Sequence, residues 1–500
     1  MFYPNMNVKK GEVKKGVTFT NFENAMNVEM DDVLLPYKTA KLCYNFNVKS
    51  GALKNGIGFK DLTLPCYTEE GVRQIIPPGE KVKRVWHYKK YSEKDKTTYD
   101  EILFYCENGD VYTCLIKSDS PLVGKLIEGI DTTAVPNAIN YRLNSEDTLI
   151  ISSETDGMWK YVQNHLIEKV EDAPHIKSMC LHYERLFAVV GGERNRLAFS
   201  ANLDPTNWTA DLSSGGFIDM QDERGGLNKV ISYNDYIYVF RDFGVARLSA
   251  YGDQSEFSVS QLFVSSVKLY GDTVTLCGNK ILLLARDGIH SFDGYSTKKL
   301  NLGIEKLFEG VENDNACGIY YNNKFYLACR LNFNDGISVG CESYDGGYVN
   351  NAIICIDLST NEVSLTRGVD ISSFAVIDDG NISKVVACFN GEYATRIGEL
   401  TEDGKVFGKV LLKKWQSPKS NMGYPTRVKH IKECLIKTKN NCVIEIETDK
   451  QKKKFEVLGK DISQRIKLNV KGEQIQVSFS SECDGETEIS CPQIVVGITN

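Results

Sequence analysis

Seven short runs of apolar residues recur along the middle of the chain, and each run is apolar at both odd and even positions. Successive runs start 47, 37, 50, 45, 44 and 60 residues apart. A strand that is apolar on both faces must be covered on both sides. A repeat of roughly 40 to 50 residues with several strands is typical of β-propeller blades, which pack face to face. The runs start at Ile102, Leu149, Leu186, Tyr236, Ile281, Phe325 and Val385.

Turn dipeptides follow four of the runs. They are Asn108-Gly109, Asp156-Gly157, Asp287-Gly288 and Asn390-Gly391. Asn-Gly and Asp-Gly are the strongest short-range hairpin signals, because both turn residues must accept a positive φ. We therefore predict an all-β chain built on a seven-bladed β-propeller. The count ranges from six to eight, because distant strands could complete the first and last blades. A large β-sandwich is the alternative.

The segments on either side of the repeat have different patterns. Residues 1–35 predict an irregular arm, since Gly11 and Gly16 interrupt it. Residues 40–59 alternate as a strand and then suit a tight hairpin with a turn at Lys49-Ser50-Gly51. We expect an N-terminal arm and β-hairpin at 1–70 and the propeller at 71–400.

Strands come at short spacing in residues 401–500, and most of them alternate apolar with polar positions. Such a sheet has one face in water, which suits a small C-terminal β-sandwich. The expected strands are Ile431 to Ile436, Cys442 to Ile446, Lys454 to Val457, Ile466 to Val470 and Ile475 to Phe479.

The composition agrees with a folded protein made in a cytoplasm and away from a membrane. The longest aliphatic run, Ile281 to Ala285, is far too short to span a bilayer. The first residues lack the basic, apolar and small-residue pattern of a signal peptide. None of the 15 cysteines forms Cys-x-x-Cys, and several lie in apolar runs. We expect reduced, buried thiols.

The net charge of −7 is unevenly distributed. Residues 401–500 carry 18 Lys and Arg against 13 Asp and Glu, whereas the first 400 carry 41 against 53. A domain so acidic does not wrap a phosphate backbone. It could line a passage through which nucleic acid slides without being bound.

The chain lacks the sequence signs of an enzyme site, and we predict no catalytic, cofactor-binding or metal-binding residues. No phosphate loop, Gly-x-Ser-x-Gly or His-Glu-x-x-His is present. Asp242-Phe243-Gly244 copies a kinase tripeptide without its companions, so we interpret it as a hairpin turn. Ser153 to Trp159 resembles the Asp-box turn of sialidases, but glycosidase action needs paired carboxylates, which the sequence alone cannot pair.

The insertion from Leu331 to Asn350 is the candidate contact loop. It combines several glycines with Tyr344 and Tyr348. Adaptable backbone with tyrosine is typical of contact loops. The same composition suits a mobile hairpin.

Two segments resemble a known family. Tyr44 to Phe59 reads Tyr-Asn-Phe-Asn-Val-Lys-Ser-Gly-Ala-Leu-Lys-Asn-Gly-Ile-Gly-Phe and resembles the opening of phage tail proteins of the nozzle and tail-accessory (head-stabilisation) type. Arg196 to Trp208 is similar to a second recurrent segment, followed by the acidic Asp219 to Asp222 and a blade like Leu227 to Leu248. The resemblance covers roughly residues 35–300.

That resemblance implies a β-propeller that packs as a ring around a tail or neck channel. We expect a structural component of a phage or prophage virion, assembled in the bacterial cytoplasm. Its partners would be copies of itself, tail, neck or portal proteins, and DNA that passes without specific binding. The alternative is a carbohydrate-binding or host-surface-binding adhesin with a pocket near Leu331 to Asn350, and a propeller glycosidase ranks third.

Overall fold

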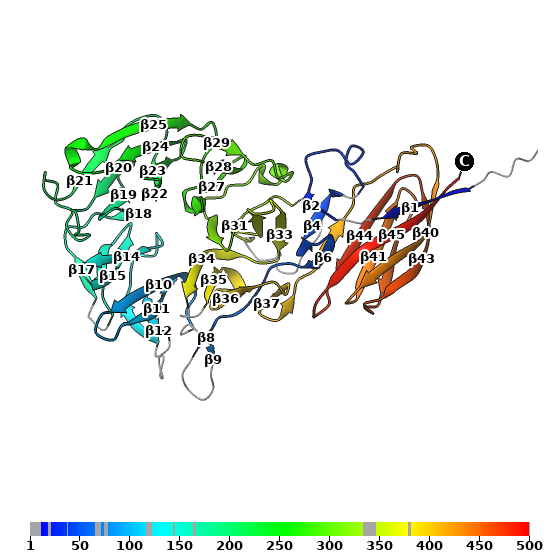
Figure 1. Cartoon of the computed structure of the whole chain (residues 1–500), viewed down its shortest axis with the longest axis horizontal. Helices are drawn as coiled ribbons and strands as arrows, with labels where there is room; N and C mark the ends of the chain where they lie inside the picture. The colour runs from blue at the N-terminus through cyan, green and yellow to red at the C-terminus, as the bar shows by residue number, and fades with distance from the viewer. Residues whose placement is uncertain are drawn as a thin grey trace, which may run out of the picture.

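The protein is all-β, as predicted, and Figure 1 shows a ring of sheets joined to a second group of sheets. The computed structural model describes residues 12–18, 22–37, 39–65, 72–74, 79–116, 123–143, 146–163, 167–333, 347–378 and 382–499. Its helical segments are short 3₁₀ turns, η1 (Gln254–Glu256), η2 (Gly271–Thr273), η3 (Glu305–Phe308) and η4 (Gly391–Tyr393).

Seven sheets follow one another along the chain, and we number them in order. Their strands pair antiparallel, apart from one parallel pairing in the seventh, with Val406 opposite Phe59. The first sheet contains β10 (Val82–Ser92), β11 (Thr97–Cys106), β12 (Val111–Leu115) and β13 (Val123–Ile127). The second contains β14 (Asn137–Leu143), β15 (Glu146–Ser153), β16 (Gly157–Tyr161) and β17 (Glu168–Val170). The third contains β18 (Ile176–His182), β19 (Arg185–Val190), β20 (Arg196–Phe199) and β21 (Gly216–Asp219). The fourth sheet contains β22 (Leu227–Tyr233), β23 (Tyr236–Arg241), β24 (Gly244–Ser249) and β25 (Ser258–Val264). The fifth contains β26 (Thr275–Cys277), β27 (Lys280–Ala285), β28 (Gly288–Phe292) and β29 (Thr297–Lys299). The sixth contains β30 (Cys317–Tyr321), β31 (Lys324–Cys329), β32 (Ala352–Asp357) and β33 (Val363–Arg367). The seventh is β34 (Ile371–Asp378), β35 (Ser383–Phe389), β36 (Ile397–Thr401), β7 (Gly58–Asp61), β37 (Lys405–Val406), β38 (Lys409–Val410).

The repeated apolar runs are the second strand of each sheet, from β11 to β35, and they are buried almost throughout. A second strand lies between two neighbours in its own sheet and between two neighbouring sheets, so neither face reaches water. This confirms the interpretation of the doubly apolar pattern. Three of the four Asn-Gly and Asp-Gly pairs connect the second strand to the third, whereas Asn390-Gly391 leads into η4.

The buried apolar residues divide into seven clusters, one between each pair of neighbouring sheets. One of them joins the seventh sheet to the first, through Val386 and Cys388 on one side and Ile102 and Phe104 on the other. Strand β10 also lies beside β34. The sheets therefore close into a β-propeller.

A strand from near the N-terminus completes the seventh sheet. Strand β7 pairs with β36 in antiparallel register, from Gly58 opposite Thr401 to Asp61 opposite Gly398. Gly58 has no room for a side chain, because a Cβ there would lie 2.4 Å from the Lys405 carbonyl oxygen. The two ends of the propeller sequence are thus held in one sheet.

Two further sheets form beside the ring, at the right of Figure 1. One contains β43 (Ser463–Gly472), β40 (Lys429–Thr438), β45 (Glu488–Thr499), β6 (Ala52–Asn55), β5 (Phe46–Lys49) and β1 (Glu12–Thr18). The other contains β4 (Leu42–Tyr44), β39 (Lys413–Gln416), β44 (Ile475–Ser481), β41 (Cys442–Thr448) and β42 (Lys452–Val457). The five C-terminal strands expected from the sequence are all present. The pairs β2 (Glu23–Met26) with β3 (Thr39–Ala40) and β8 (Thr63–Pro65) with β9 (Val72–Gln74) are separate.

The prediction of an irregular arm over residues 1–35 is wrong for residues 12–18. Strand β1 pairs with β45 over seven residues, from Glu12 opposite Thr499 to Thr18 opposite Gln493. Gly16, which was expected to interrupt the arm, pairs with Val495 inside the strand, because hydrogen bonds from β45 compensate for its weak local propensity. The hairpin of β5 and β6 forms at Ser50-Gly51, as expected, and also joins this sheet. The domain division at residues 70 and 400 stays a prediction.

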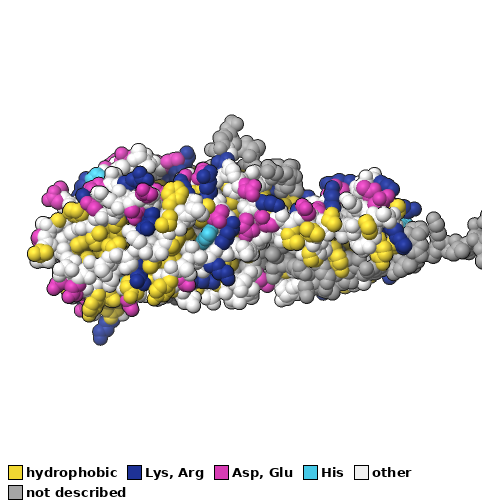
Figure 2. All heavy atoms as spheres, turned by 90° about the horizontal axis from the view of Figure 1, so that it is seen from above, with side chains coloured by type: hydrophobic (Ala, Val, Ile, Leu, Met, Phe, Trp, Pro, Cys, Tyr) yellow, Lys and Arg dark blue, Asp and Glu magenta, His cyan; other side chains and the backbone are white. Residues whose placement is uncertain are grey.

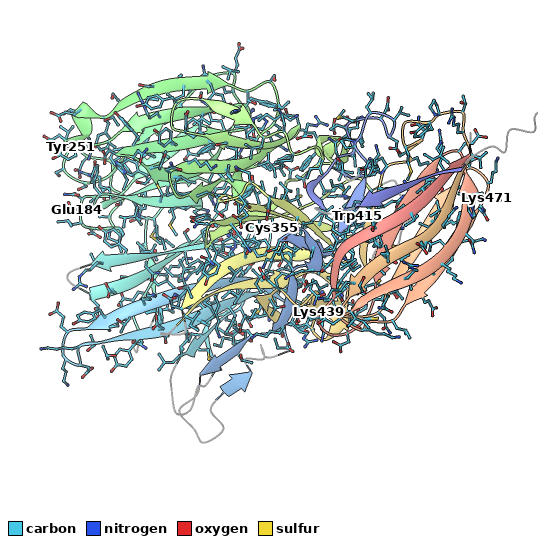
Figure 3. The ribbon with its side chains drawn as sticks, turned by 45° about the vertical axis from the view of Figure 1, so that its right-hand side comes forward. Glu184, Tyr251, Cys355, Trp415, Lys439 and Lys471 are labelled. Atoms are coloured by element: carbon cyan, nitrogen blue, oxygen red, sulfur yellow. The ribbon has the colours of Figure 1, made fainter. Side chains whose placement is uncertain are left out.

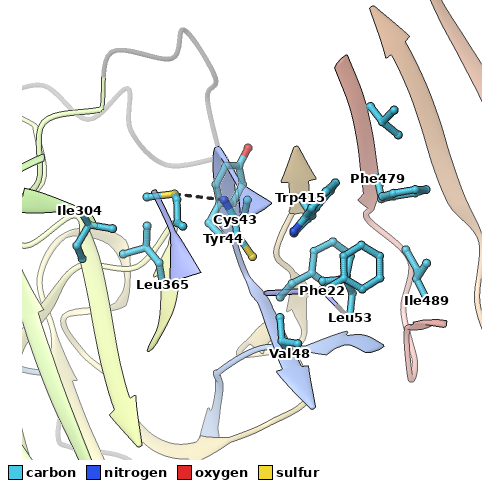
Figure 4. Packing of buried hydrophobic residues seen from close by; sticks show 14 of the residues in the cluster. Phe22, Cys43, Tyr44, Val48, Leu53, Ile304, Leu365, Trp415, Phe479 and Ile489 are labelled. Carbon is cyan, nitrogen blue, oxygen red and sulfur yellow. Dashed lines mark hydrogen bonds between the residues drawn. The ribbon is translucent and has the colours of Figure 1, made fainter. Parts of the chain in front are cut away.

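Phe22 lies in the core between these two sheets and is buried. Its ring meets Trp415 edge-on at a centroid distance of 5.1 Å and Phe479 at 6.0 Å (Figure 4). The same cluster continues through Ile304 and Leu365 into the fifth and sixth sheets of the propeller. A continuous apolar core therefore joins the two parts of the molecule.

Asn45 makes the polar contacts of this joint. Its backbone N–H donates to the Leu365 carbonyl at 2.8 Å, and its side-chain amide donates to the Leu412 carbonyl at 2.7 Å. Its Oδ1 accepts from the Arg367 N–H at 2.8 Å, and its carbonyl accepts from the Gly56 N–H at 3.0 Å. Asn45 has a φ of 59° and is fully buried. Asparagine suits this left-handed conformation better than most residues.

The described cysteines are free thiols, and all except Cys483 are buried. Among the described residues, no helix is long and apolar enough to cross a membrane.

We expect Asn45→Ala to lower the free energy of unfolding by about 3 kcal/mol, because it leaves buried groups of two chain segments without hydrogen bonds. Denaturant titration followed by tryptophan fluorescence measures the change. Asn47→Ala is the matched control, since Asn47 is half-buried in the next strand. Equal stability of the two variants would contradict the role given to Asn45.

Candidate functional site

A β-bulge recurs at the start of the first strand in four sheets. The register shifts by one residue in β10, β18, β22 and β34. The extra residues are Lys83, Lys177, Asn228 and Ser372, and all four line one cavity. A bulge leaves a residue unpaired and turns it away from the ladder. The repeat therefore places polar side chains at the same end of the propeller axis.

The cavity at this end of the axis has a volume of about 870 Å³. Each of the seven sheets contributes to its wall, at or next to the beginning of its first strand. The wall is mainly polar and includes five asparagines, which are Asn137, Asn228, Asn315, Asn350 and Asn390. We call it the axial cavity.

Side-chain hydrogen bonds connect the first four sheets around the axial cavity. Arg84 donates through Nη1 to Asn137 Oδ1 at 2.8 Å, and Asn137 Nδ2 donates to the Lys177 carbonyl at 2.8 Å. Lys177 Nζ donates to Asn228 Oδ1 at 2.9 Å, and Asn228 Nδ2 donates to Asp242 Oδ1 at 2.7 Å. These hydrogen bonds within the protein therefore hold the side chains of the wall in place without a ligand.

Both signs of charge occur around the wall, and two opposite pairs are in contact, Lys83 with Glu107 and Lys268 with Asp314. The basic residues of the wall are Lys83, Arg84, Lys177 and Lys268, and the acidic residues are Glu107, Glu154, Asp242, Asp272 and Asp314. The propeller's own cavity is therefore mixed in charge and not an acidic lumen.

Three nearby cations affect the protonation of Asp272. Partial desolvation inside the cavity acts to raise its pKa, but Lys229, Arg84 and Lys177 together outweigh this effect and lower the pKa below the usual 3.8. Lys229 Nζ lies 3.6 Å from its Oδ1. Hydrogen bonds and charge from Lys81 and Lys83 likewise lower the pKa of Glu107, which also lines the cavity. Carboxylates held ionised in this way are poor general acids.

The insertion expected to carry contacts reaches the axial cavity at its C-terminal end. Val349 and Asn350 line the cavity, and both backbone N–H groups donate to Asp370 at 2.9 Å. Tyr348 is half-buried just before them. Tyr344 lies outside the described residues, so its role stays a prediction.

A second surface lies on turns at the other edge of the sheets. Tyr251 and Leu212 are 74% and 91% exposed, and Gln254 ties their loops together by donating to the Ser214 carbonyl at 2.9 Å. The Tyr183 ring meets Tyr251 edge-on at 5.6 Å. We define the tyrosine face as the exposed residues Tyr183, Leu203, Leu212, Tyr251 and Tyr295. Figure 3 places Tyr251 at the end of the molecule farthest from Lys471.

His182 lies beneath the tyrosine face and is 3% exposed. Its ring lies 4.4 Å from that of Tyr183, and Nδ1 is 2.8 Å from Ser232 Oγ. Burial lowers the pKa of His182 below its usual 6.5, although Asp235 acts in the opposite direction. The neutral imidazole is therefore the form that the fold accommodates.

Within the described ranges, no group of three or more His, Cys, Asp or Glu side chains is placed to hold a metal ion. Asp242-Phe243-Gly244 is a hairpin turn between β23 and β24, as interpreted from the sequence. Asp242 accepts from the Gly226 N–H at 2.7 Å and so fixes the turn. The arrangement suits the binding of polar groups and protein surfaces.

Sequence reasoning missed the bulged residues, although a signal was present. Four segments place two polar residues between apolar ones, where a regular strand alternates singly. They are Val82-Lys83-Arg84-Val85, Ile176-Lys177-Ser178-Met179, Leu227-Asn228-Lys229-Val230 and Ile371-Ser372-Ser373-Phe374.

No protein-family model matches the chain, and no curated protein matches it in sequence. Solved structures with a similar arrangement include the Neurospora crassa Pan2 WD40 domain, at 8% identity over 64% of this chain and 89% of that chain, with a TM-score of 0.36. The RRP9 WD40 repeats match at 8% identity over 68% and 98%, with a TM-score of 0.39. A fungal alcohol oxidase of the AA5 family in complex with copper matches at 9% identity over 80% and 92%, with a TM-score of 0.41. Similarity this weak carries no argument about activity or ligands.

We expect Asp242→Ala to lower the free energy of unfolding by about 2 kcal/mol, since two N–H donors in the wall lose their acceptor. Chemical denaturation provides the measurement. Asp314→Ala is the control, because that carboxylate is 60% exposed and its ion-pair partner among the described residues is Lys268, and a surface pair contributes little. The prediction fails if both variants lose the same amount.

Acid should weaken the protein through His182. Well above pH 6.5 the imidazole is neutral in both the folded and the unfolded chain, so its titration does not affect the free energy of unfolding. As pH falls below 6.5 the unfolded chain takes up the proton first, and stability decreases down to the lower folded pKa. Melting temperatures between about pH 7.5 and about pH 5 should fall less for His182→Gln than for the exposed control His175→Gln. Parallel curves for the two variants would exclude this role.

Proposed function

We propose that the protein is a structural component of a phage or prophage tail or neck, a seven-bladed β-propeller with a C-terminal β-sandwich that contacts neighbouring virion proteins in a ring. The observation that carries the proposal is the joint between the two parts. Phe22, Trp415 and Phe479 extend one apolar core from the fifth and sixth sheets into the flanking sheets. A rigid body that spans two contact regions suits a component that holds its neighbours at fixed spacing.

The two ends of this body differ in chemistry, which supports contact between unlike surfaces. The propeller end presents the tyrosine face, and tyrosine is enriched in protein interfaces. Figure 2 shows groups of hydrophobic side chains on that part of the molecule. The opposite end presents exposed lysines of β42 and β43, and we define the lysine edge as Lys452, Lys453, Lys454, Lys467 and Lys471.

A second copy of the chain is the occupant we propose for the tyrosine face. The first 400 residues are acidic and the last 100 are basic, so the lysine edge of one copy complements the propeller end of the next. Head-to-tail contact between different surfaces generates a closed ring when the rotation closes. DNA would pass through the opening between copies, and not through the propeller's own axial cavity.

The segments Tyr44 to Phe59 and Arg196 to Trp208 support placement in a virion through their resemblance to nozzle and tail-accessory proteins. Both take part in the architecture that the proposal requires. The first includes Asn45 at the joint and the first two residues of strand β7, which completes the seventh sheet, and the second includes strand β20 of the third sheet.

Sedimentation velocity and negative-stain images of the full chain test the proposal. We expect closed rings at low salt that dissociate as salt screens the charges. Tyr251→Ser with Leu212→Ser should weaken ring formation by about tenfold or more. The control Val264→Ser, at a residue 65% exposed on another edge, should assemble like the original chain. Monomers alone, both in isolation and with candidate tail, neck or portal proteins, would overturn the proposal.

A further inference from the structure

We propose that the axial cavity binds a small acidic saccharide, a sugar that carries a carboxylate together with several hydroxyl groups. This inference is independent of ring assembly, since the cavity lies at the opposite edge of the sheets from the tyrosine face. It concerns only the described wall of the cavity.

Two cations in the wall are available to a carboxylate. Arg84 and Lys177 line the cavity, and no carboxylate of the described residues lies within ion-pair distance of either. Arg84 uses Nη1 for the Pro136 carbonyl and Asn137, and Lys177 Nζ donates to Asn228. Both retain donors, because a guanidinium has five N–H groups and an ammonium three. A ligand carboxylate would form charge-assisted hydrogen bonds with them.

The rest of the wall suits hydroxyl groups. Amide side chains both donate and accept, as hydroxyls do. Of the five asparagines in the wall, Asn315 is exposed, whereas Asn137, Asn228 and Asn390 share hydrogen bonds with neighbouring residues and Asn350 is buried. Asp272 is 56% exposed, and the nearby cations keep it ionised. An ionised carboxylate accepts hydrogen bonds only, so it suits a ligand hydroxyl and disfavours a second anionic group beside it.

The size and rigidity of the cavity favour a saccharide over a simple anion. A volume of about 870 Å³ lies within the range of pockets that enclose drug-sized ligands, roughly 300 to 1,000 Å³. Phosphate would engage the cations but leave most of the polar wall unused. The hydrogen-bonded series from Arg84 to Asp242 holds the wall in place, so little ordering is needed on binding.

Calorimetric titration of the full chain tests the proposal with uronic acid and sialic acid saccharides, a neutral glucose disaccharide and inorganic phosphate. We expect at least one acidic saccharide to bind about tenfold or more tightly than either the neutral disaccharide or phosphate. Equal binding of the neutral disaccharide, equal or tighter binding of phosphate, or no binding of any acidic saccharide at about 10 mM would overturn it.

Two variants locate the site. Lys177→Gln should lower the affinity for the acidic saccharide by about tenfold. The control Lys298→Gln, at an exposed lysine of β29, should leave that affinity unchanged. Asp272→Ser should weaken saccharide binding without weakening phosphate binding, because a serine hydroxyl is a weaker acceptor for a saccharide hydroxyl than a carboxylate, whereas phosphate only loses a repulsive charge. Unchanged saccharide affinity in Lys177→Gln, or parallel losses of saccharide and phosphate in Asp272→Ser, would place binding elsewhere.

Discussion

The propeller sheets are apolar on both faces, and this constraint shapes the whole molecule. A sheet of this kind cannot end a stack, because its outer face would remain in water. The seven clusters of buried residues show how the constraint is met, since each lies between two neighbours and one joins the last sheet to the first. Strand β7 secures this closure, because it brings a distant part of the chain into the seventh sheet.

Closure by an N-terminal strand has a consequence for the flanking sheets. Residues before β7 must lie beside residues after β36, and both segments enter the sheets next to the ring. Asn45 bonds to residues of the sixth propeller sheet and of the segment before β39. The two parts are therefore connected through several chain segments and a shared core, which is the physical basis for a rigid body with two ends.

The axial cavity follows from the same ring geometry. The first strands converge around the axis, and polar residues at or next to their starts line the cavity. Bulges at Lys83, Lys177, Asn228 and Ser372 place these residues in one wall. The hydrogen bonds between sheets then fix the wall, so its shape depends on the closed ring and not on one sheet.

The sequence predicted the repeat, the strand class and the hairpins, because local alternation and turn residues act over a few positions. It also predicted the five C-terminal strands, in which polar and apolar residues alternate. Tyr348 and the insertion were singled out by composition, but only the fold placed Val349 and Asn350 on the axial cavity. The bulged residues are marked in the sequence by two adjacent polar residues between apolar ones. Only the arrangement of the sheets around an axis shows that these positions line one cavity.

Other features arise from contacts between distant segments. Glu12 to Thr18 forms a strand because β45 supplies its partner, and Phe22 is buried because Trp415 and Phe479 meet it. Tertiary structure alone also decided which charges face one another, as Arg84 and Lys177 do with Asp272. Local pattern thus determined the strands, whereas closure of the ring determined their neighbours, since pairing over hundreds of residues leaves no trace in a short window of sequence.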